Sequence, residues 1–284
     1  MEERRRAYLR EALRGKAASW ALCIGIVFFT IEGASISSWR LIVGGIAVTV
    51  LVVFAVAYWS ARTRAATDFF AELAPRLGLE YSRYGDYVPM TPLLSAGDRR
   101  KYNHAMQGPL HGKLGGPTCL LAHYTYETRH DAGEEVTVWK PHPFTVCAID
   151  VGGPLLRFRG VYLRPRLSGL GLDNDWLNRG PKFDKVELES VRFNELYDLR
   201  HGSDQDEIAL RELFSPTFVA SLTENPLRPG FECKAGTLVV FIRGHEASEG
   251  KISMLLDTAR SIARRLDEQD TPHFATAERP LVGR

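Results

Sequence analysis

Two apolar runs stand near the start of the chain, at Ala17–Ile31 and Leu41–Trp59. The second run carries no charged residue, and a helix that rises about 1.5 Å per residue would let it cross a hydrocarbon core of about 30 Å. Trp39, Tyr58 and Trp59 stand at its ends, where amphipathic aromatic rings prefer the headgroup zone. The pattern therefore predicts a transmembrane helix.

The first run is shorter, and it follows a basic stretch in the way that the apolar core of a cleaved signal peptide does. Two observations favour a retained helix instead. Ile31 is followed by Glu32, Gly33 and Ala34, without a small-x-small cleavage pattern, and the second run starts after a short connector. Because short connectors join antiparallel helices, we predict a transmembrane hairpin over residues 17–60, with a cleaved signal plus one span as the alternative.

Basic residues are distributed unevenly around the two predicted spans. They are frequent in residues 1–16 and recur at Arg62 and Arg64 after the second span, whereas the connector offers Arg40 alone. Because cytoplasmic flanks carry the excess of Lys and Arg, the N-terminus and the segment after the second span should both face the cytoplasm. Glycines in the spans either let the two helices approach closely or reflect the frequency of Gly in membrane helices; they are Gly25, Gly44 and Gly45.

Beyond the spans, a helix is predicted over Ala65–Leu77, and the pattern then changes to the alternation of β-strands. In Leu121–Glu127, for example, Leu, His, Thr and Glu point to one face, and Ala and two Tyr point to the other. Turn-rich separators between consecutive strands predict an antiparallel meander. The predicted strands are Leu79–Tyr84, Ala105–Leu114, Thr118–Thr128, Val136–Val151 and Leu155–Leu163.

The C-terminal third carries the clearest pattern. Val191–Leu199 is predicted as a strand, an acidic turn then opens a helix that ends near Phe214, and Ser215–Pro216 opens a second helix. A hairpin is expected around Ala235–Gly236. The closing helix has one apolar stripe at i, i+3, i+4 and i+7 spacing, which should pack on the sheet. The stripe comprises Ile252, Leu255, Leu256, Ala259, Ile262, Ala263 and Leu266.

These segments together predict an α+β fold, in which an N-terminal transmembrane helical hairpin is followed by a soluble domain with an antiparallel β-sheet and flanking helices. The soluble domain is placed at residues 65–268, and the tail at residues 269–284 is expected to be disordered because it lacks periodicity. The turn-rich residues 166–185, with a Gly-rich centre at Ser168–Gly180, are expected to form an ordered loop or a mobile insertion.

The C-terminal half also resembles a known family. Its strand, acidic turn, helix, hairpin and terminal helix follow in the order found in the DUF3137-like proteins, bacterial membrane proteins of unknown function with two N-terminal spans and a cytoplasmic α+β domain. The resemblance covers about Ala65–Glu268, and Ser168–Gly180 departs from it. It implies this architecture and supplies no catalytic residues. The matching positions are Phe193, Tyr197, Leu213, Pro216, Phe218 and Leu222.

Composition adds little, because 45% hydrophobic residues, 25% charged residues and a net charge of +2 give no global indication of nucleic-acid binding. The 4 cysteines form no CxxC pair and are predicted to be free thiols. The chain contains neither a G-x-S-x-G elbow nor a phosphate loop. Loosely clustered histidines lack the spacing of a zinc site, so we expect no metal, no cofactor and no catalytic residue. They are His104, His111, His123, His130 and His142.

Arginines are the candidate binding residues. Arg157 and Arg159 alternate within a predicted strand and should share a face, while Arg260 and Arg264 lie on the polar side of the closing helix beside Arg265. A basic cluster next to an anionic leaflet attracts lipid headgroups by about 1 kcal/mol per side chain. The alternative is a solvated surface of mixed charge, because acidic residues interleave with the helix arginines. They are Asp257, Asp267 and Glu268.

The sequence therefore predicts a membrane-anchored cytoplasmic interaction or scaffold module without catalytic activity. The alternative is a membrane-surface domain that binds a lipid headgroup or a small anionic ligand, and an enzyme comes third. The expected location is the bacterial inner membrane, as a multi-pass protein whose N-terminus and soluble domain are cytoplasmic. The expected partners are the lipid bilayer and other membrane or cytoplasmic proteins, with no nucleic acid.

Overall fold

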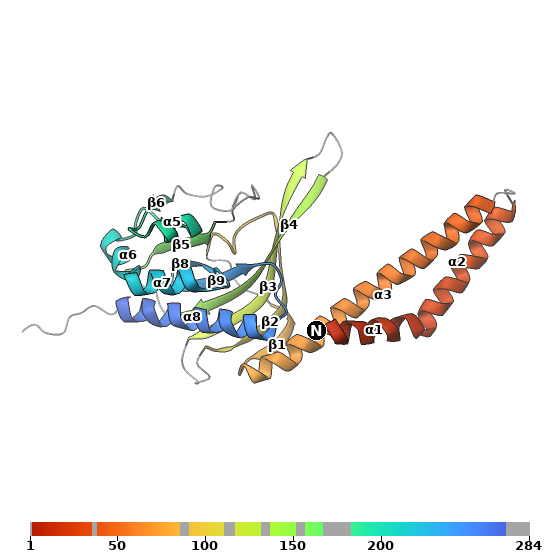
Figure 1. Cartoon of the computed structure of the whole chain (residues 1–284), viewed down its shortest axis with the longest axis horizontal. Helices are drawn as coiled ribbons and strands as arrows, with labels where there is room; N and C mark the ends of the chain where they lie inside the picture. Colours follow the sequence, from red (N-terminus) through yellow and green to blue (C-terminus); the bar gives the residue numbers. More distant parts are fainter. Residues whose placement is uncertain are drawn as a thin grey trace, which may run out of the picture. The chain divides into compact units, whose positions relative to one another are not determined.

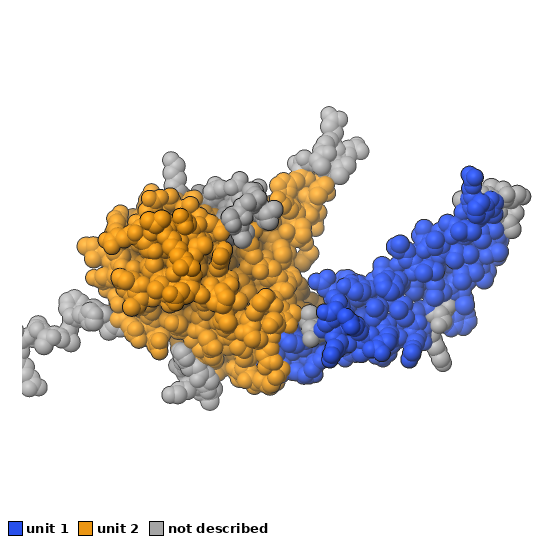
Figure 2. Space-filling model, viewed as in Figure 1, with its two compact units in different colours: residues 1–73 blue, residues 74–284 orange. Residues whose placement is uncertain are grey.

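The structure is a computed structural model, and it divides the chain into two compact units, residues 1–73 and residues 74–284 (Figure 2). The first unit is helical in its described part, and the second carries a β-sheet with flanking helices, so the predicted α+β class is confirmed. The structure describes residues 2–35, 39–85, 91–110, 117–131, 137–151, 157–166 and 183–270.

The first unit contains α1 (Glu2–Arg14), α2 (Lys16–Ser35) and most of α3 (Trp39–Arg76) (Figure 1). The stretch Ile42–Arg76 of α3 is long and apolar enough to cross a membrane, whereas the apolar stretch of α2, Trp20–Ile31, is shorter. One candidate membrane span, in α3, is thus present among the described residues, and the span predicted over Ala17–Ile31 stays a prediction.

Helices α2 and α3 approach each other most closely at glycines. A Cβ atom added to Gly25 would lie 2.3 Å from Cγ2 of Thr49, and one added to Gly45 would lie 2.1 Å from the ring of Phe29. Gly44, one position away, has nothing within 4 Å of such an atom. The close approach predicted from the glycines is therefore confirmed at Gly25 and Gly45, and Gly44 takes no part in it.

Polar contacts hold α1 beside the C-terminal part of α3. Arg4 forms an ion pair of 2.6 Å with Glu72, and the hydroxyl of Tyr8 donates to Asp68. The chain bends at Gly15, between α1 and α2. The helical unit is thus closed by polar contacts at one end and by small residues at the other.

The second unit is built on one nine-stranded sheet in which every neighbouring pair is antiparallel. The strand order β1-β2-β3-β4-β9-β8-β5-β7-β6 begins with the predicted meander, because short connections join consecutive antiparallel strands. The strands are β1 (Glu80–Tyr84), β2 (Arg99–Pro109), β3 (Thr118–Asp131), β4 (Thr137–Asp150), β5 (Gly160–Pro165), β6 (Asp184–Val186), β7 (Tyr197–His201), β8 (Gly230–Lys234) and β9 (Thr237–Arg243).

The two faces of the sheet are covered differently. Helix α8 (Glu249–Asp270) packs on β4 and β9, and its predicted apolar stripe is buried at every position (Figure 1). The opposite face carries a core built around Tyr124, Tyr126 and Phe241, with Leu93 and Leu94 packed over it. Alternation along β3 therefore places His123 on the α8 side and its neighbour Tyr124 in the opposite core.

Within the described part of this unit, three short helices follow: α5 (Val191–Leu196), α6 (Glu207–Leu213) and α7 (Pro216–Glu224). Helix α7 begins with Pro216 at its first turn, as predicted, although the Ser215 hydroxyl makes no capping bond to the helix. The hairpin of β8 and β9 around Ala235–Gly236 is also confirmed.

The predicted strand Val191–Leu199 is wrong in its first part, because Val191–Leu196 forms α5 and the strand begins at Tyr197. The Ser190 hydroxyl accepts the Phe193 N–H at 3.3 Å and so caps a helical turn. The buried rings of Phe193 and Tyr197 then stack at 5.1 Å, a contact that helical i, i+4 spacing provides.

Two further boundaries differ from the prediction. Strand β2 starts at Arg99 rather than Ala105, because its polar first half pairs with β3. Strand β5 starts at Gly160, so residues 157–159 precede it. Helix α8 continues to Asp270, while Ser168–Gly180 and residues 271–284 lie outside the described residues.

The neighbouring glycines of α3 offer a matched test of the helix contact. Gly45→Ala should lower the thermal midpoint of the full-length protein in detergent, because overpacking costs about 1–3 kcal/mol. Gly44→Ala should leave the midpoint unchanged or raise it, since Ala is favoured over Gly by about 1 kcal/mol within a helix. Differential scanning fluorimetry compares the two variants, and equal shifts would contradict the contact.

Candidate functional site

Three histidines from different parts of the second unit lie together on the α8 side of the sheet. His104 comes from β2, His123 from β3 and His245 from the connection between β9 and α8. The rings of His123 and His245 are parallel, with centroids 4.5 Å apart, and His104 meets His123 edge-on at 5.7 Å. We call these three residues the histidine cluster.

A β-bulge brings His104 into the cluster. The pairing of β2 with β3 shifts register between Asn103 and Met106, and His104 has a φ of 52°. Tyr102 and Ala105 both pack with the core around Tyr124, so the bulge leaves His104 on the side of His123. A non-glycine residue in this left-handed conformation costs about 1–3 kcal/mol, which the surrounding structure must offset.

Each histidine has a polar contact from a neighbouring element. The His104 Nδ1 atom lies 3.0 Å from the hydroxyl of Tyr81, on β1. The His245 Nε2 atom lies 2.9 Å from the hydroxyl of Thr125, on β3. Because Nε2 of His123 lies 2.7 Å from the carbonyl oxygen of Glu246, and a carbonyl accepts, this nitrogen carries the proton.

Glu246 links the cluster to the start of α8. Its carboxylate accepts the backbone N–H groups of Ala247 and Ser248 at 3.0 Å each and pairs with Lys251 at 2.9 Å. Its own N–H donates to the Thr145 hydroxyl at 2.8 Å. The carbonyl that binds His123 is therefore held by contacts to β4 and α8.

Burial keeps the two central histidines neutral at ordinary pH. Desolvation lowers the pKa of His123 to about 3, with smaller effects of His245 and His104. Desolvation also lowers the pKa of His104 to about 4, assisted by His245 and Arg83. Protonation would place positive charges against one another in a poorly solvated site, so His104 and His123 act as neutral hydrogen-bonding groups.

The histidine cluster is not arranged as a metal centre. Nitrogen lone pairs lie in the plane of an imidazole ring, so the parallel rings of His123 and His245 do not converge on one ion. No group of three His, Cys, Asp or Glu side chains within the described part of the chain is arranged to hold a metal.

The structure thus brings together two histidines of the loose group predicted from the sequence and adds His245. The alternation of β3 places His123 correctly, but nothing in the sequence indicates the bulge at His104. His130 and His142 form a separate pair, both within 3.2 Å of the Thr128 hydroxyl. His111 lies outside the described residues.

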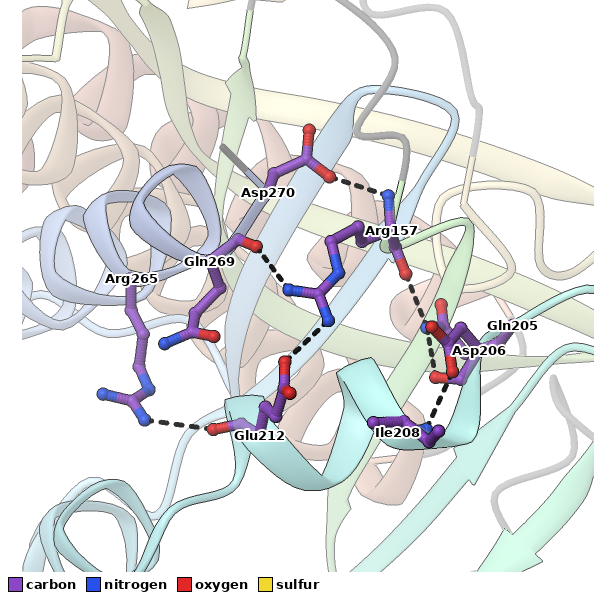
Figure 3. A network of polar contacts seen from close by, with 8 residues as sticks. All are labelled: Arg157, Gln205, Asp206, Ile208, Glu212, Arg265, Gln269 and Asp270. Carbon is purple, nitrogen blue, oxygen red and sulfur yellow. Dashed lines mark hydrogen bonds and ion pairs between the residues drawn. The ribbon is translucent and has the colours of Figure 1, made fainter. Parts of the chain in front are cut away.

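Arg157 precedes β5, so its predicted placement on a strand is wrong. Its guanidinium contacts a carboxylate oxygen of Glu212 at 2.6 Å and the carbonyl of Gln269 at 2.9 Å (Figure 3). Its backbone N–H donates to Asp270 at 2.7 Å, and its carbonyl accepts the amide of Gln205 at 2.7 Å. The residue therefore fastens the chain before β5 to α6 and to the end of α8.

Arg159 also precedes β5, and its backbone N–H donates to the side chain of Gln205 at 2.9 Å. Arg260 donates to the carbonyl of Leu110 at 2.7 Å and pairs with Asp257 at 3.1 Å, while Arg264 pairs with Glu268 at 3.8 Å.

The four predicted arginines do not converge on one site. Arg157 binds at Asp270, the last residue of α8, whereas Arg260 lies ten residues earlier, about 15 Å along the helix axis. The acidic residues that interleave along α8 take part in its ion pairs, through Asp257 and Glu268.

A second feature is the overhang of strands β3 and β4. Strand β2 pairs with β3 only as far as Glu127, and β9 pairs with β4 only from Phe144. Thr128–Asp131 therefore pair with Thr137–Lys140, whereas residues 141–143 pair with β3 residues 125–127, which also pair with β2. Residues Thr128–Asp131 and Thr137–Pro143 extend beyond the paired ends of β2 and β9 (Figure 1). We call them the β3–β4 arm.

The arm presents side chains typical of interaction surfaces. The guanidinium of Arg99 lies 3.8 Å from the ring centroid of Trp139, and Val138 on the other face is 47% exposed. Trp and Arg are the residue types most often found at energetic centres of protein interfaces.

The outer edge of the arm resists the addition of another strand. The carbonyl of Pro143 accepts the N–H of Gly244 on the β9 side, so residues at odd numbers direct their backbone groups outward. Because proline has no N–H, Pro141 and Pro143 remove two donors from that edge. A partner would therefore bind the side chains of the arm rather than add a strand to its outer edge.

The histidine cluster predicts a loss of stability at low pH. Below the unfolded pKa of about 6.5, the unfolded chain binds protons that buried His123 does not, so stability falls by about 1.4 kcal/mol per pH unit for this group. Between about pH 7 and pH 5, His123→Asn should lose less thermal stability than the wild type, whereas the exposed control His130→Asn should behave like the wild type. Equal pH dependence in both variants would contradict the assignment.

Comparisons with known proteins add no functional assignment. No family model matches the chain, and a search of the curated proteins finds no match. Among solved structures, the crystal structure of the mycobacterial trehalose monomycolate transport factor A, TtfA, is similar, with a TM-score of 0.48 and 12% sequence identity over 72% of this chain and 95% of that chain. Similarity of this extent does not transfer a function, and the resemblance to the DUF3137-like proteins stays a prediction.

Proposed function

We propose that the protein is a membrane-anchored interaction module whose docking element is the β3–β4 arm. The observation that carries this proposal is the arm itself, seven residues of β4 that extend past the pairing of β9. Most residues of this β4 segment are exposed, so it loses burial that a strand inside the sheet would gain, and the fold does not require that cost. A partner that covers the arm would recover that burial.

The anchor in this proposal is a hairpin of α2 and α3. The apolar stretch of α3 supports one of the two spans. The glycine contacts at Gly25 and Gly45 support the placement of α2 beside it in the same membrane. Lys and Arg concentrate at both ends of the hairpin, which favours a cytoplasmic N-terminus and a cytoplasmic sheet unit. The membrane is proposed to be the bacterial inner membrane, in keeping with the family resemblance.

Recognition of a lipid headgroup by the predicted arginines has weaker support. Arg157 is engaged by Glu212 and by the carbonyl of Gln269, and Arg260 by Asp257 and by the carbonyl of Leu110. These contacts already engage two donor nitrogens of each guanidinium, which leaves fewer for a phosphate. The interaction module is therefore the function that the geometry favours.

Site-specific photocrosslinking tests the arm. A photoreactive phenylalanine analogue at Val138, in the full-length chain in its native membrane, should give a discrete protein adduct, whereas the same group at Ile208 of α6, which is more exposed, should not. Trp139→Ala should reduce the Val138 adduct about tenfold, because interface tryptophans contribute about 2 kcal/mol or more. Identical adducts from Val138 and Ile208, or a Val138 adduct insensitive to Trp139→Ala, would exclude the arm as the docking element.

Protease protection tests the anchor. With a short epitope at each end of the full-length chain, both epitopes should resist external protease in spheroplasts and should be cleaved after permeabilisation. Digestion of the N-terminal epitope alone in intact spheroplasts would show a single span with the N-terminus outside. The hairpin would then be wrong, while the test of the arm would be unaffected.

A further inference from the structure

The helical unit contains a cavity of about 520 Å³, open on one side, between α3 and the α1–α2 segment. This volume falls within the range of about 300–1,000 Å³ that is typical of small-molecule sites. The cavity lies wholly within the first unit. Its lining residues are Glu11, Ala12, Gly15, Ala18, Ala21, Val52, Val53, Val56, Ala57, Ser60 and Arg64.

The cavity lies between contacts at the two ends of α3, and α1 also reaches α3 in between, where Arg5 donates to the Tyr58 hydroxyl at 3.2 Å. The pair of Tyr8 and Asp68 closes one end, and Gly25 against Thr49 closes the other. Between these contacts the chain bends at Gly15, and α1 and α2 meet at an angle beside the straighter α3 (Figure 1). The side chains that α1 and α2 contribute there are mainly alanines, so they do not fill the space left by the bend.

The lining changes from apolar to polar along α3. Val52, Val53, Val56 and Ala57 form the apolar part, and Ser60 and Arg64 follow toward the other end. Twelve residues of helix separate the two extremes, a distance of about 18 Å. Because the apolar part belongs to the candidate membrane span, the open side of the cavity would face hydrocarbon, and the polar end would lie near the headgroups.

The polar end carries one charge of each sign. Glu11 and Arg64 both line it, yet among the described residues neither forms an ion pair, with the other or with any third group. A zwitterionic headgroup with a phosphate and a primary amine is complementary to this arrangement, because guanidinium binds phosphate and carboxylate accepts from an ammonium group.

From this geometry, and resting on the proposed membrane anchorage, we propose that the cavity binds a bilayer phospholipid with an amine headgroup. One acyl chain occupies the space between the alanines of α1 and α2 and the valines of α3. The phosphate lies at Arg64 and the amine at Glu11. The lipid fills the space that the helices leave open and so joins α1 and α2 to the stretch of α3 that lines the cavity.

Native mass spectrometry of the full-length chain tests the site. The protein is equilibrated with mixed vesicles of equal parts phosphatidylethanolamine, phosphatidylglycerol and phosphatidylcholine, and the lipids that it retains in mild detergent are counted. Phosphatidylethanolamine should be retained in preference to the other two. Ala21→Phe, which fills the cavity, should reduce retention about tenfold, whereas Ala55→Phe, an exposed position of α3 outside the cavity, should not.

The headgroup assignment has its own matched variants. Arg64→Gln should weaken retention of all phospholipids about tenfold, and Arg62→Gln, exposed and outside the lining, should not. Glu11→Gln should abolish the preference for phosphatidylethanolamine over phosphatidylglycerol, and Glu3→Gln should preserve it. Equal retention in Ala21→Phe and Ala55→Phe, or preferred retention of phosphatidylglycerol by the wild type, overturns the proposal. A chain that is integrated in membranes but retains no lipid contradicts the site alone, whereas a chain absent from the membrane fraction contradicts the anchor.

Discussion

The pairing of β3 with β4 is the interaction on which the second unit depends. The two strands of 14 residues pair over their full length, and they are the partners through which β2 and β9 join the sheet. Because side chains alternate, this single register places Tyr124 in one core and His123 under α8. A slip of one residue would exchange the two faces, placing the polar His123 in the aromatic core and Tyr124 under α8.

Two buried charged groups inside this unit are tolerated because each has a specific partner. Arg164 is 2% exposed and pairs with Asp198 at 2.8 Å, and fully buried Glu232 accepts the N–H of Leu93 at 2.8 Å. Removing one member of a buried ion pair costs about 3–5 kcal/mol, so such pairs specify one arrangement of the strands. The histidine cluster meets the same constraint differently, since burial keeps His123 uncharged and its proton is given to a carbonyl.

The helical unit follows another principle, because little of its surface is buried. Its helices touch through polar contacts at Arg4 and Tyr8 and through small residues at Gly25 and Gly45. The space between these contacts is set by the bend at Gly15. Helices in lipid gain no hydrophobic energy from each other, so close packing and polar bonds hold them together. Gaps between them are filled by the surrounding medium, which here is proposed to be lipid.

The sequence by itself determined the features that depend on local pattern: the apolar stretch of α3, the meander, the β8–β9 hairpin and the stripe of α8. Local periodicity decides these because each element buries one face. Only the tertiary structure decided the bulge at His104, the approach of His245 and the helical turn after Ser190. It also moved Arg157 off the predicted strand. The bulge and the approach of His245 arise from contacts between residues distant in sequence, which no local period encodes. The turn after Ser190 depends on a local cap that the pattern of apolar residues does not show.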